Sequence, residues 1–250
     1  MRSAVFVSLV MASMAAAQRS MTVHNACPFT IWPALFTSAG GVPSQPTGWE
    51  APSLSSVTFS VPEDWNGRIW GRRDCDFSTN AGAKSCLDGG CSGGLLCDVT
   101  NETAAPPFTL TEFTLDAGGS DFVDVSLVNG FNLPVRIDNT AGCGTPSCTV
   151  DLNANCPAAQ KGPLDSTGAA VGCKSACLID QQAGNGENSP NCCTGTHDTP
   201  ATCPPTGVTN FAYFKGNCPN AIAYPYDEGS TTLWECSSSS KAAYTVTFCP

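Results

Sequence analysis

The sequence is poor in histidine and in basic residues, and each shortage excludes a class of function. Its 250 residues include only two histidines, His24 and His197, and no pair of Cys-x-x-Cys units, which argues against a zinc site. Eleven basic residues stand against 21 acidic ones, for a net charge of −10. Such a chain offers no basic patch to nucleic acid and no polybasic segment to anionic lipid. It also lacks a glycine-rich loop that would cradle phosphate, so we expect no metal and no cofactor.

Long apolar runs are also missing, apart from one at the N-terminus. Residues 4–11 are apolar, but a membrane span needs about 20 such residues. Arg2 precedes this run and Ala15–Ala17 follow it, an order typical of a secretory signal peptide. We therefore expect residues 1–17 to be removed and the protein to be secreted, to the extracellular space or the cell wall, without a transmembrane segment. A buried N-terminal helix is the alternative interpretation.

Cysteine, in contrast, is abundant. The chain has 16 cysteines, and the first of them, Cys27, lies well beyond the predicted signal peptide. An even number in an oxidising compartment predicts eight disulfides. Spacing alone does not assign the pairs, because so many cysteines can combine in about two million ways.

Alternating polar and apolar residues predict several short strands. Within residues 122–127, Val123, Val125 and Leu127 share one face, and Asp124 points away from it. Glycine (24 residues) and proline (19 residues) separate the runs, as turn residues do. The pattern predicts a mainly β fold, either a sandwich or a barrel. The predicted strands are residues 21–23, 56–61, 68–70, 122–127 and 245–248.

The alternation disappears between Cys143 and Cys218, where nine of the cysteines gather. Residues 170–182 can form a helix with one apolar stripe, and asparagine, serine, glycine and proline dominate elsewhere. This segment has too little apolar mass to hold its shape alone. Short disulfide loops would stabilise it by about 2–4 kcal/mol each. We expect a second, cysteine-rich subdomain attached to the β core.

Several stretches resemble the thaumatin-like protein family, and together they span the chain from about Met21 to its last residue. The 16 cysteines, enough for eight disulfides, also follow the order found in that family. The stretches are Gly67–Arg72 leading to Cys75, Cys91–Cys97, Leu110–Leu115, Asp124–Pro134, the pair Cys192-Cys193, and Tyr244–Pro250.

The resemblance implies a β-sandwich, a disulfide-rich second subdomain that contains a helix, and a small disulfide-stapled third lobe. We expect the sandwich at about residues 18–142 and 237–250, and the cysteine-rich subdomain at about 143–236. The resemblance also implies the pairing of the cysteines. The implied pairs are Cys27–Cys249, Cys75–Cys86, Cys91–Cys97, Cys143–Cys236, Cys148–Cys218, Cys156–Cys173, Cys177–Cys192 and Cys193–Cys203.

Many members of this family line a cleft between the sandwich and the cysteine-rich part with one arginine, one glutamate and three aspartates. In this chain one of the three aspartates is replaced by an asparagine, so one carboxylate of the set is missing. The implied set is Arg68, Glu112, Asp124, Asn129 and Asp227, with Glu228 as an alternative to Asp227.

Glycoside hydrolysis requires one protonated carboxyl to donate to the leaving oxygen and one ionised carboxylate as nucleophile or base. We expect Glu112 to be the acid, because its apolar sequence neighbours would desolvate it and raise its pKa. Asp124 would be the ionised partner, and pairing with Arg68 would keep Asp124 or Asp227 ionised. The amide of Asn129 can hydrogen-bond a sugar hydroxyl.

Aromatic residues near these positions are candidates for a sugar-stacking platform. Tyr224 and Tyr226 flank Pro225 in a predicted loop and are the better candidates. For Trp70 and Phe113 we favour packing in the core, and Phe131 is a further candidate for either role.

Two functions of different classes remain open at this stage. The first is a weak endo-β-1,3-glucanase that acts on wall polysaccharide, and the retained Glu112, Asp124 and Asp227 favour it. The second is a non-catalytic antifungal, defence or glucan-binding protein, which Asn129 favours. We expect a monomer, and an N-glycan on Asn101, because Asn101-Glu102-Thr103 is an acceptor sequence.

Overall fold

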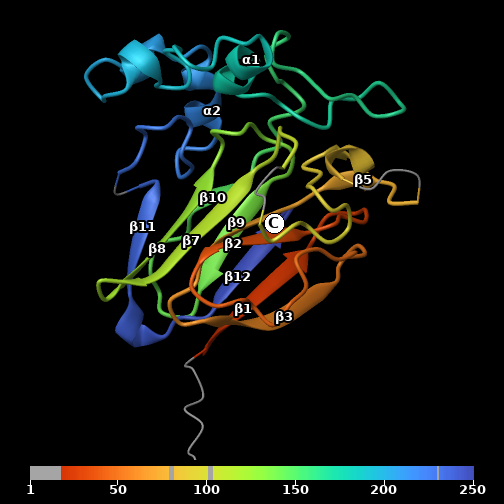
Figure 1. The fold of residues 1–250 in the computed structure, drawn as a ribbon, viewed down its shortest axis with the longest axis vertical. Coiled ribbons are helices and arrows are strands. Elements are labelled where there is room, and N and C mark those ends of the chain that lie inside the picture. The colour runs from red at the N-terminus through yellow and green to blue at the C-terminus, as the bar shows by residue number, and fades with distance from the viewer. Residues whose placement is uncertain (1–17, 79–81, 101–103, 230) are drawn as a thin grey trace, which may run out of the picture.

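The computed structural model describes residues 18–78, 82–100, 104–229 and 231–250. The predicted signal peptide and the predicted glycan acceptor Asn101 lie outside these residues. Two five-stranded sheets pack face to face, and a small two-stranded sheet lies beside them (Figure 1). The expected mainly β fold is confirmed, and it is a sandwich rather than a barrel.

The first sheet has the order β10-β9-β12-β1-β3, and its only parallel pair is β1 with β12. The second has the order β11-β8-β7-β4-β2 and is antiparallel throughout. The strand bounds are β1 Gln18–Asn25, β2 Ala34–Ala39, β3 Ser56–Pro62, β4 Asn66–Trp70, β5 Arg73–Cys75, β6 Cys86–Asp88, β7 Leu110–Ala117, β8 Ser120–Ser126, β9 Val135–Asn139, β10 Ser147–Cys148, β11 Leu233–Ser237 and β12 Tyr244–Phe248. All five predicted strands are present.

The core lies between the two large sheets and follows the alternation seen in the sequence. Val123 and Val125 of β8 are fully buried against it, as are Met21 of β1 and Ile69 of β4. Because successive side chains of a strand point to opposite faces, the intervening residues of β4, β7 and β8 face outward. That outward face of the second sheet carries the cleft described below.

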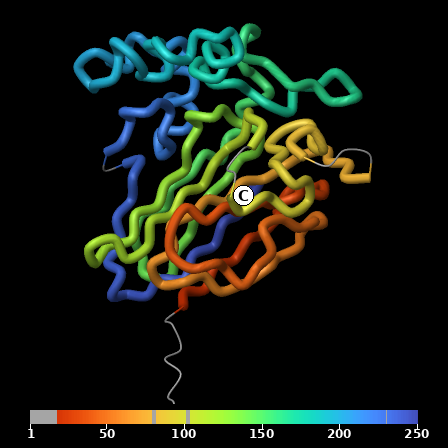
Figure 2. Tube along the Cα trace, viewed as in Figure 1, coloured from red at the N-terminus to blue at the C-terminus, as the bar shows by residue number. Residues whose placement is uncertain are grey.

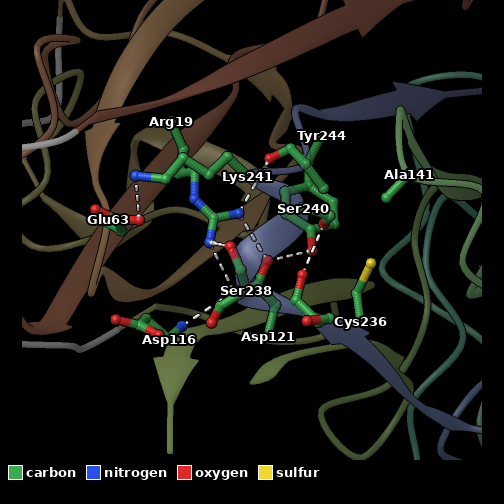
Figure 3. Close-up of polar contacts among 12 residues, drawn as sticks. Arg19, Glu63, Asp116, Asp121, Ala141, Cys236, Ser238, Ser240, Lys241 and Tyr244 are labelled. Carbon is green, nitrogen blue, oxygen red and sulfur yellow. Dashed lines mark hydrogen bonds and ion pairs between the residues drawn. The ribbon is translucent and has the colours of Figure 1, made fainter. Parts of the chain in front are cut away.

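A buried ion pair joins the two sheets at one end of the sandwich (Figure 3). The guanidinium of Arg19 on β1 donates to both carboxylate oxygens of Asp121 on β8, at 2.8 and 3.1 Å. Asp121 also accepts from the hydroxyl of Tyr244 at 2.7 Å and from the backbone N–H of Asp116 at 3.0 Å. Both side chains are buried, and both oxygens of Asp121 are hydrogen-bonded, whereas Nε of Arg19 has no partner among the described residues.

The cysteine-rich segment forms an irregular layer that covers one end of the sandwich (Figures 1 and 2). Its two short helices are α1, Ala176–Gln182, and α2, Phe211–Asn217. The predicted helix 170–182 was too long at its start, because the backbone of Cys173 pairs with that of Phe131 and because Ser175 caps α1. Helix α2 was not predicted from the sequence. The 3₁₀ helices are η1 Ala83–Ser85, η2 Gly195–His197, η3 Pro205–Gly207 and η4 Ser238–Ser240.

Eight disulfides link the described cysteines, and they are the pairs that the family resemblance implies. Four of them, Cys156–Cys173, Cys177–Cys192, Cys193–Cys203 and Cys148–Cys218, hold the cysteine-rich layer together or to β10. Strand β11 crosses the expected boundary at residue 236, and its pairing with β8 makes the whole strand part of the sandwich. No helix within the described residues is long and apolar enough to cross a membrane.

Candidate functional site

A cleft of about 470 Å³ opens between the outward face of the second sheet and the cysteine-rich layer. The sheet forms one wall, and segments 128–129 and 222–228 form the other. Ser175 connects the second wall to α1, because its hydroxyl donates to the carbonyl of Val128 at 2.7 Å while it caps the helix. The lining residues are Arg68, Leu110, Glu112, Thr114, Phe122, Asp124, Ser126, Val128, Asn129, Ile222, Pro225, Glu228 and Leu233.

Three of the expected site residues stand in one row across the sheet wall. Arg68 of β4 is the register partner of Glu112 on β7, and Glu112 is the register partner of Asp124 on β8. Residues directly opposite each other on neighbouring antiparallel strands have Cβ atoms only about 4.5–5.5 Å apart. The strand pairing thus places one cation and two carboxylates side by side on the sheet wall of the cleft.

Arg68 forms an ion pair with Glu112, a partner that we had not expected. Its Nε lies 2.9 Å from Oε1 of Glu112, and both side chains remain about one-third exposed. Asp227, the other expected partner, is held elsewhere: its Oδ2 accepts from Lys215 Nζ at 2.9 Å and from the backbone N–H of Ala223 at 2.8 Å. The ion pair with Arg68 therefore stabilises the ionised form of Glu112.

Asp124 is the least solvated carboxyl of the row. It is 7% exposed, and its Oδ1 has no hydrogen-bond partner among the described residues. Burial raises the pKa of Asp124 well above its ordinary value, and the charges of Glu112 and Glu228 raise it further, whereas Arg68 lowers it. Burial also raises the pKa of Glu112, but contact with Arg68 opposes that shift. The pair is therefore arranged to hold a proton, with Asp124 the more desolvated site.

The third acidic residue that lines the cleft is Glu228 and not Asp227. Glu228 lines the cleft and raises the pKa values of both Glu112 and Asp124, while Asp227 points into the cysteine-rich layer. Asn129 lines the cleft as expected and has no side-chain partner among the described residues, so its amide is available to a ligand.

The predicted stacking platform is not where we expected it. Tyr224 is buried and packs edge-on against Phe211, with the ring centroids 5.4 Å apart. Tyr226 donates its hydroxyl to the carbonyl of Asp198 and does not line the cleft either. Pro225 between them does line it. The aromatic residue of the cleft is Phe122, half-buried on β8, and its place two residues before Asp124 on a strand was the signal that could have identified it.

The remaining aromatic candidates are buried, in agreement with the expected packing role. Phe113 packs against Trp65 and Tyr244 in the core, and Phe131 is fully buried there too. Trp70 is 3% exposed, packs against Phe108 and donates its indole N–H to the carbonyl of Gly89. Within the described part of the chain, no group of three or more histidine, cysteine, aspartate or glutamate side chains is arranged to hold a metal ion.

Comparison with known proteins agrees with this architecture. The sequence profile of the Thaumatin family matches residues 25–250. The chain is 42% identical over 235 residues to "Thaumatin-like protein 1" of Pyrus pyrifolia, covering 92% of this chain and 90% of that protein. It is 39% identical over 239 residues to a protein of Prunus avium named "Glucan endo-1,3-beta-glucosidase", again covering 92% and 90%. A match of this length and identity leaves no doubt about kinship, and the chain belongs to the thaumatin family.

Proposed function

We propose that this protein is secreted and acts on β-1,3-glucan in the acidic cleft, as a weak endo-β-1,3-glucanase. The observation that carries the proposal is the row of Arg68, Glu112 and Asp124 on the sheet wall of the cleft. The name of the Prunus avium relative supports the same substrate. Eight disulfides support export to an oxidising compartment, where we expect a monomer with a glycan on Asn101.

The contacts favour a distribution of roles that is the reverse of the one expected from sequence. Asp124 is the more desolvated carboxyl and has one unpartnered oxygen, so it holds a proton more readily and acts as the general acid. Glu112 is paired with Arg68 and acts as the ionised partner, either as nucleophile or as the base that activates water. In the reaction, Asp124 donates its proton to the glycosidic oxygen as the bond to the anomeric carbon breaks.

The direct test is release of reducing ends from soluble β-1,3-glucan. Glu112→Gln and Asp124→Asn should each lower turnover by about 10²–10⁴, because each removes one of the two carboxyl functions. Glu50→Gln and Asp64→Asn are matched controls, since both residues are exposed and lie outside the cleft. A folded Glu112→Gln or Asp124→Asn protein with wild-type turnover would contradict the proposal.

A substrate with a good leaving group separates the two roles. An aryl β-glucoside of this kind needs little protonation, so loss of the general acid should affect its cleavage far less than loss of the nucleophile or base. We expect Asp124→Asn to recover activity on such a substrate and Glu112→Gln to remain inactive. The opposite pattern would restore the roles expected from sequence.

A second candidate function is glucan binding without cleavage, as in a defence or antifungal protein. Asn129 favours it, because this chain carries an amide where the family resemblance implies a carboxylate. A wild-type protein that binds insoluble β-1,3-glucan yet releases no reducing ends over long incubation would establish this function in place of hydrolysis. In that case Glu112→Gln should alter affinity alone.

A further inference from the structure

The cleft has a side pocket that the proposed reaction does not use. A second cavity, of about 140 Å³, adjoins the cleft and shares Arg68, Leu110 and Asn129 with it. The rest of its wall comes from β4 and from the segment that leads into β7. These further lining residues are Trp70, Ala104, Pro106 and Phe108.

The floor of the side pocket is rigid and apolar. Trp70 and Phe108 are 3% and 5% exposed, and their ring centroids lie 5.7 Å apart. The indole N–H of Trp70 donates to the carbonyl of Gly89 at 2.8 Å, which fixes the orientation of the ring. Ala104, Pro106 and Asn129 are half-buried and form the rim. The pocket is therefore formed before any ligand arrives, a condition that favours affinity.

The size of the side pocket suits one six-membered ring. An apolar cavity of about 150 Å³ accommodates benzene, so 140 Å³ takes one ring and not two. The chemistry suits a sugar, because a pyranose presents C–H groups on its faces and hydroxyls at its edge. The small exposed part of the aromatic floor would contact C–H groups of the ring, and the side chains of Arg68 and Asn129 at the mouth would bind hydroxyls.

We propose that the side pocket binds a single terminal hexosyl unit of the polysaccharide that lies in the cleft. The proposal rests on the proposed action on β-1,3-glucan. A terminal unit has two sources: a one-residue branch on the main chain, or the end of the main chain itself. Both present the same ring with one linkage leading back toward Arg68 and Asn129.

The test fills the pocket without touching the catalytic row. Ala104→Leu places a larger side chain at the rim, and Ala104→Val is a milder version should the first variant fold poorly. Ala170→Leu is the matched control, since Ala170 is a half-buried alanine of the cysteine-rich layer that lines neither cavity. The probes are a linear β-1,3-linked glucohexaose and the same hexaose with one β-1,6-linked glucosyl branch. Affinity is measured by calorimetry, and mass spectrometry verifies that each probe stays intact.

If branches enter the pocket, wild type should bind the branched probe about tenfold more tightly, the size of one aromatic contact. Ala104→Leu should then abolish the difference and leave affinity for the linear probe unchanged. If chain ends enter it, wild type should bind both probes equally, and Ala104→Leu should weaken both by about tenfold. An Ala104→Leu protein that binds both probes as wild type does would overturn the proposal. Failure of wild type to bind either probe would overturn the glucan function itself.

Discussion

Two aspartates of strand β8 have opposite environments although they are three residues apart. Asp121 faces inward and has four donors, two from Arg19, one from Tyr244 and one from the backbone of Asp116. Asp124 faces the cleft, is nearly as buried, and leaves one oxygen without a partner. Burial alone therefore does not decide the role of a carboxylate. A fully partnered one stabilises the fold, whereas an incompletely partnered one beside a cleft is able to exchange a proton.

The largest effect should come from neutralising the fully partnered aspartate, Asp121. Asp121→Asn leaves the buried guanidinium of Arg19 without its counter-ion, which typically costs 3–5 kcal/mol in the free energy of unfolding, or about 10 °C in the melting temperature. Asp138→Asn is the control, because its ion pair with Arg136 is exposed. The Arg19→Met/Asp121→Asn double variant should be less destabilised than Asp121→Asn alone. An unchanged melting temperature for Asp121→Asn would contradict this account.

A third aspartate tests whether an incompletely partnered buried carboxylate matters away from a cleft. Asp88 is 1% exposed, Asn132 donates to its Oδ1 at 2.8 Å, and its Oδ2 has no partner within the described part of the chain. Burial raises its pKa to about 7. Folding therefore favours the protonated form, and its contribution to stability is complete below about pH 4 and is lost as the pH rises through 7.

Asp88→Asn should abolish this pH-dependent loss of folding stability, which is on the order of 4 kcal/mol by linkage. The substitution should leave glucan cleavage unchanged. Chemical unfolding at pH 4 and at pH 8 measures the effect as the difference between variant and wild type. Asp98→Asn is a control of opposite sign, because hydrogen bonds from Thr100 lower the pKa of Asp98. Equal pH dependence in wild type and Asp88→Asn would show that Asp88 is solvated in solution.

Replacing Asp124, the incompletely partnered aspartate of the cleft, should raise stability and lower activity. At neutral pH, Asp124→Asn replaces a carboxyl whose ionised form is disfavoured by burial, so the melting temperature should rise by a few degrees while turnover falls. Differential scanning calorimetry at pH 5 and pH 8 checks the sign, because the gain should be larger at pH 8. A lower melting temperature at both pH values would mean that Asp124 stabilises the fold as Asp121 does.

The smallest effect should come from the arginine of the cleft. Arg68 lowers the pKa values of both Glu112 and Asp124, so Arg68→Met should shift both limbs of the pH–rate profile to higher pH. The rate at the optimum should fall about fivefold or less, as expected for a partly exposed ion pair. Arg136→Met removes a somewhat more exposed pair outside the cleft and should leave the profile unchanged.

The sequence predicted the features that depend on the alternation of polar and apolar residues and on the order of the family's motifs along the chain. Alternation located β3, β8 and β12, and it placed Asp124 on the face opposite to Val123 and Val125. Family order placed Glu112 and Asp124 near each other, and the register of β7 with β8 accounts for their proximity.

Loop geometry could not be predicted from the sequence, because a loop has no periodic pattern of polar and apolar residues. Between Ala223 and Gly229 the chain turns so that Glu228 reaches the cleft while Asp227 bonds Lys215. Alternation would put Tyr224 and Tyr226 together on one side, yet each packs away from the cleft. The ion pair of Arg68 with Glu112 was likewise not predicted, because it depends on the register of β4 with β7.

The first and last strands lie side by side, and Cys27–Cys249 fastens them together across 222 residues. In topological terms the polypeptide is nearly a ring. A protease that cuts any one peptide bond between these two cysteines opens the ring without dividing it, so both pieces remain one covalent body and keep their packing. Cleavage in an exposed loop should therefore be invisible on a non-reducing gel and appear only after reduction.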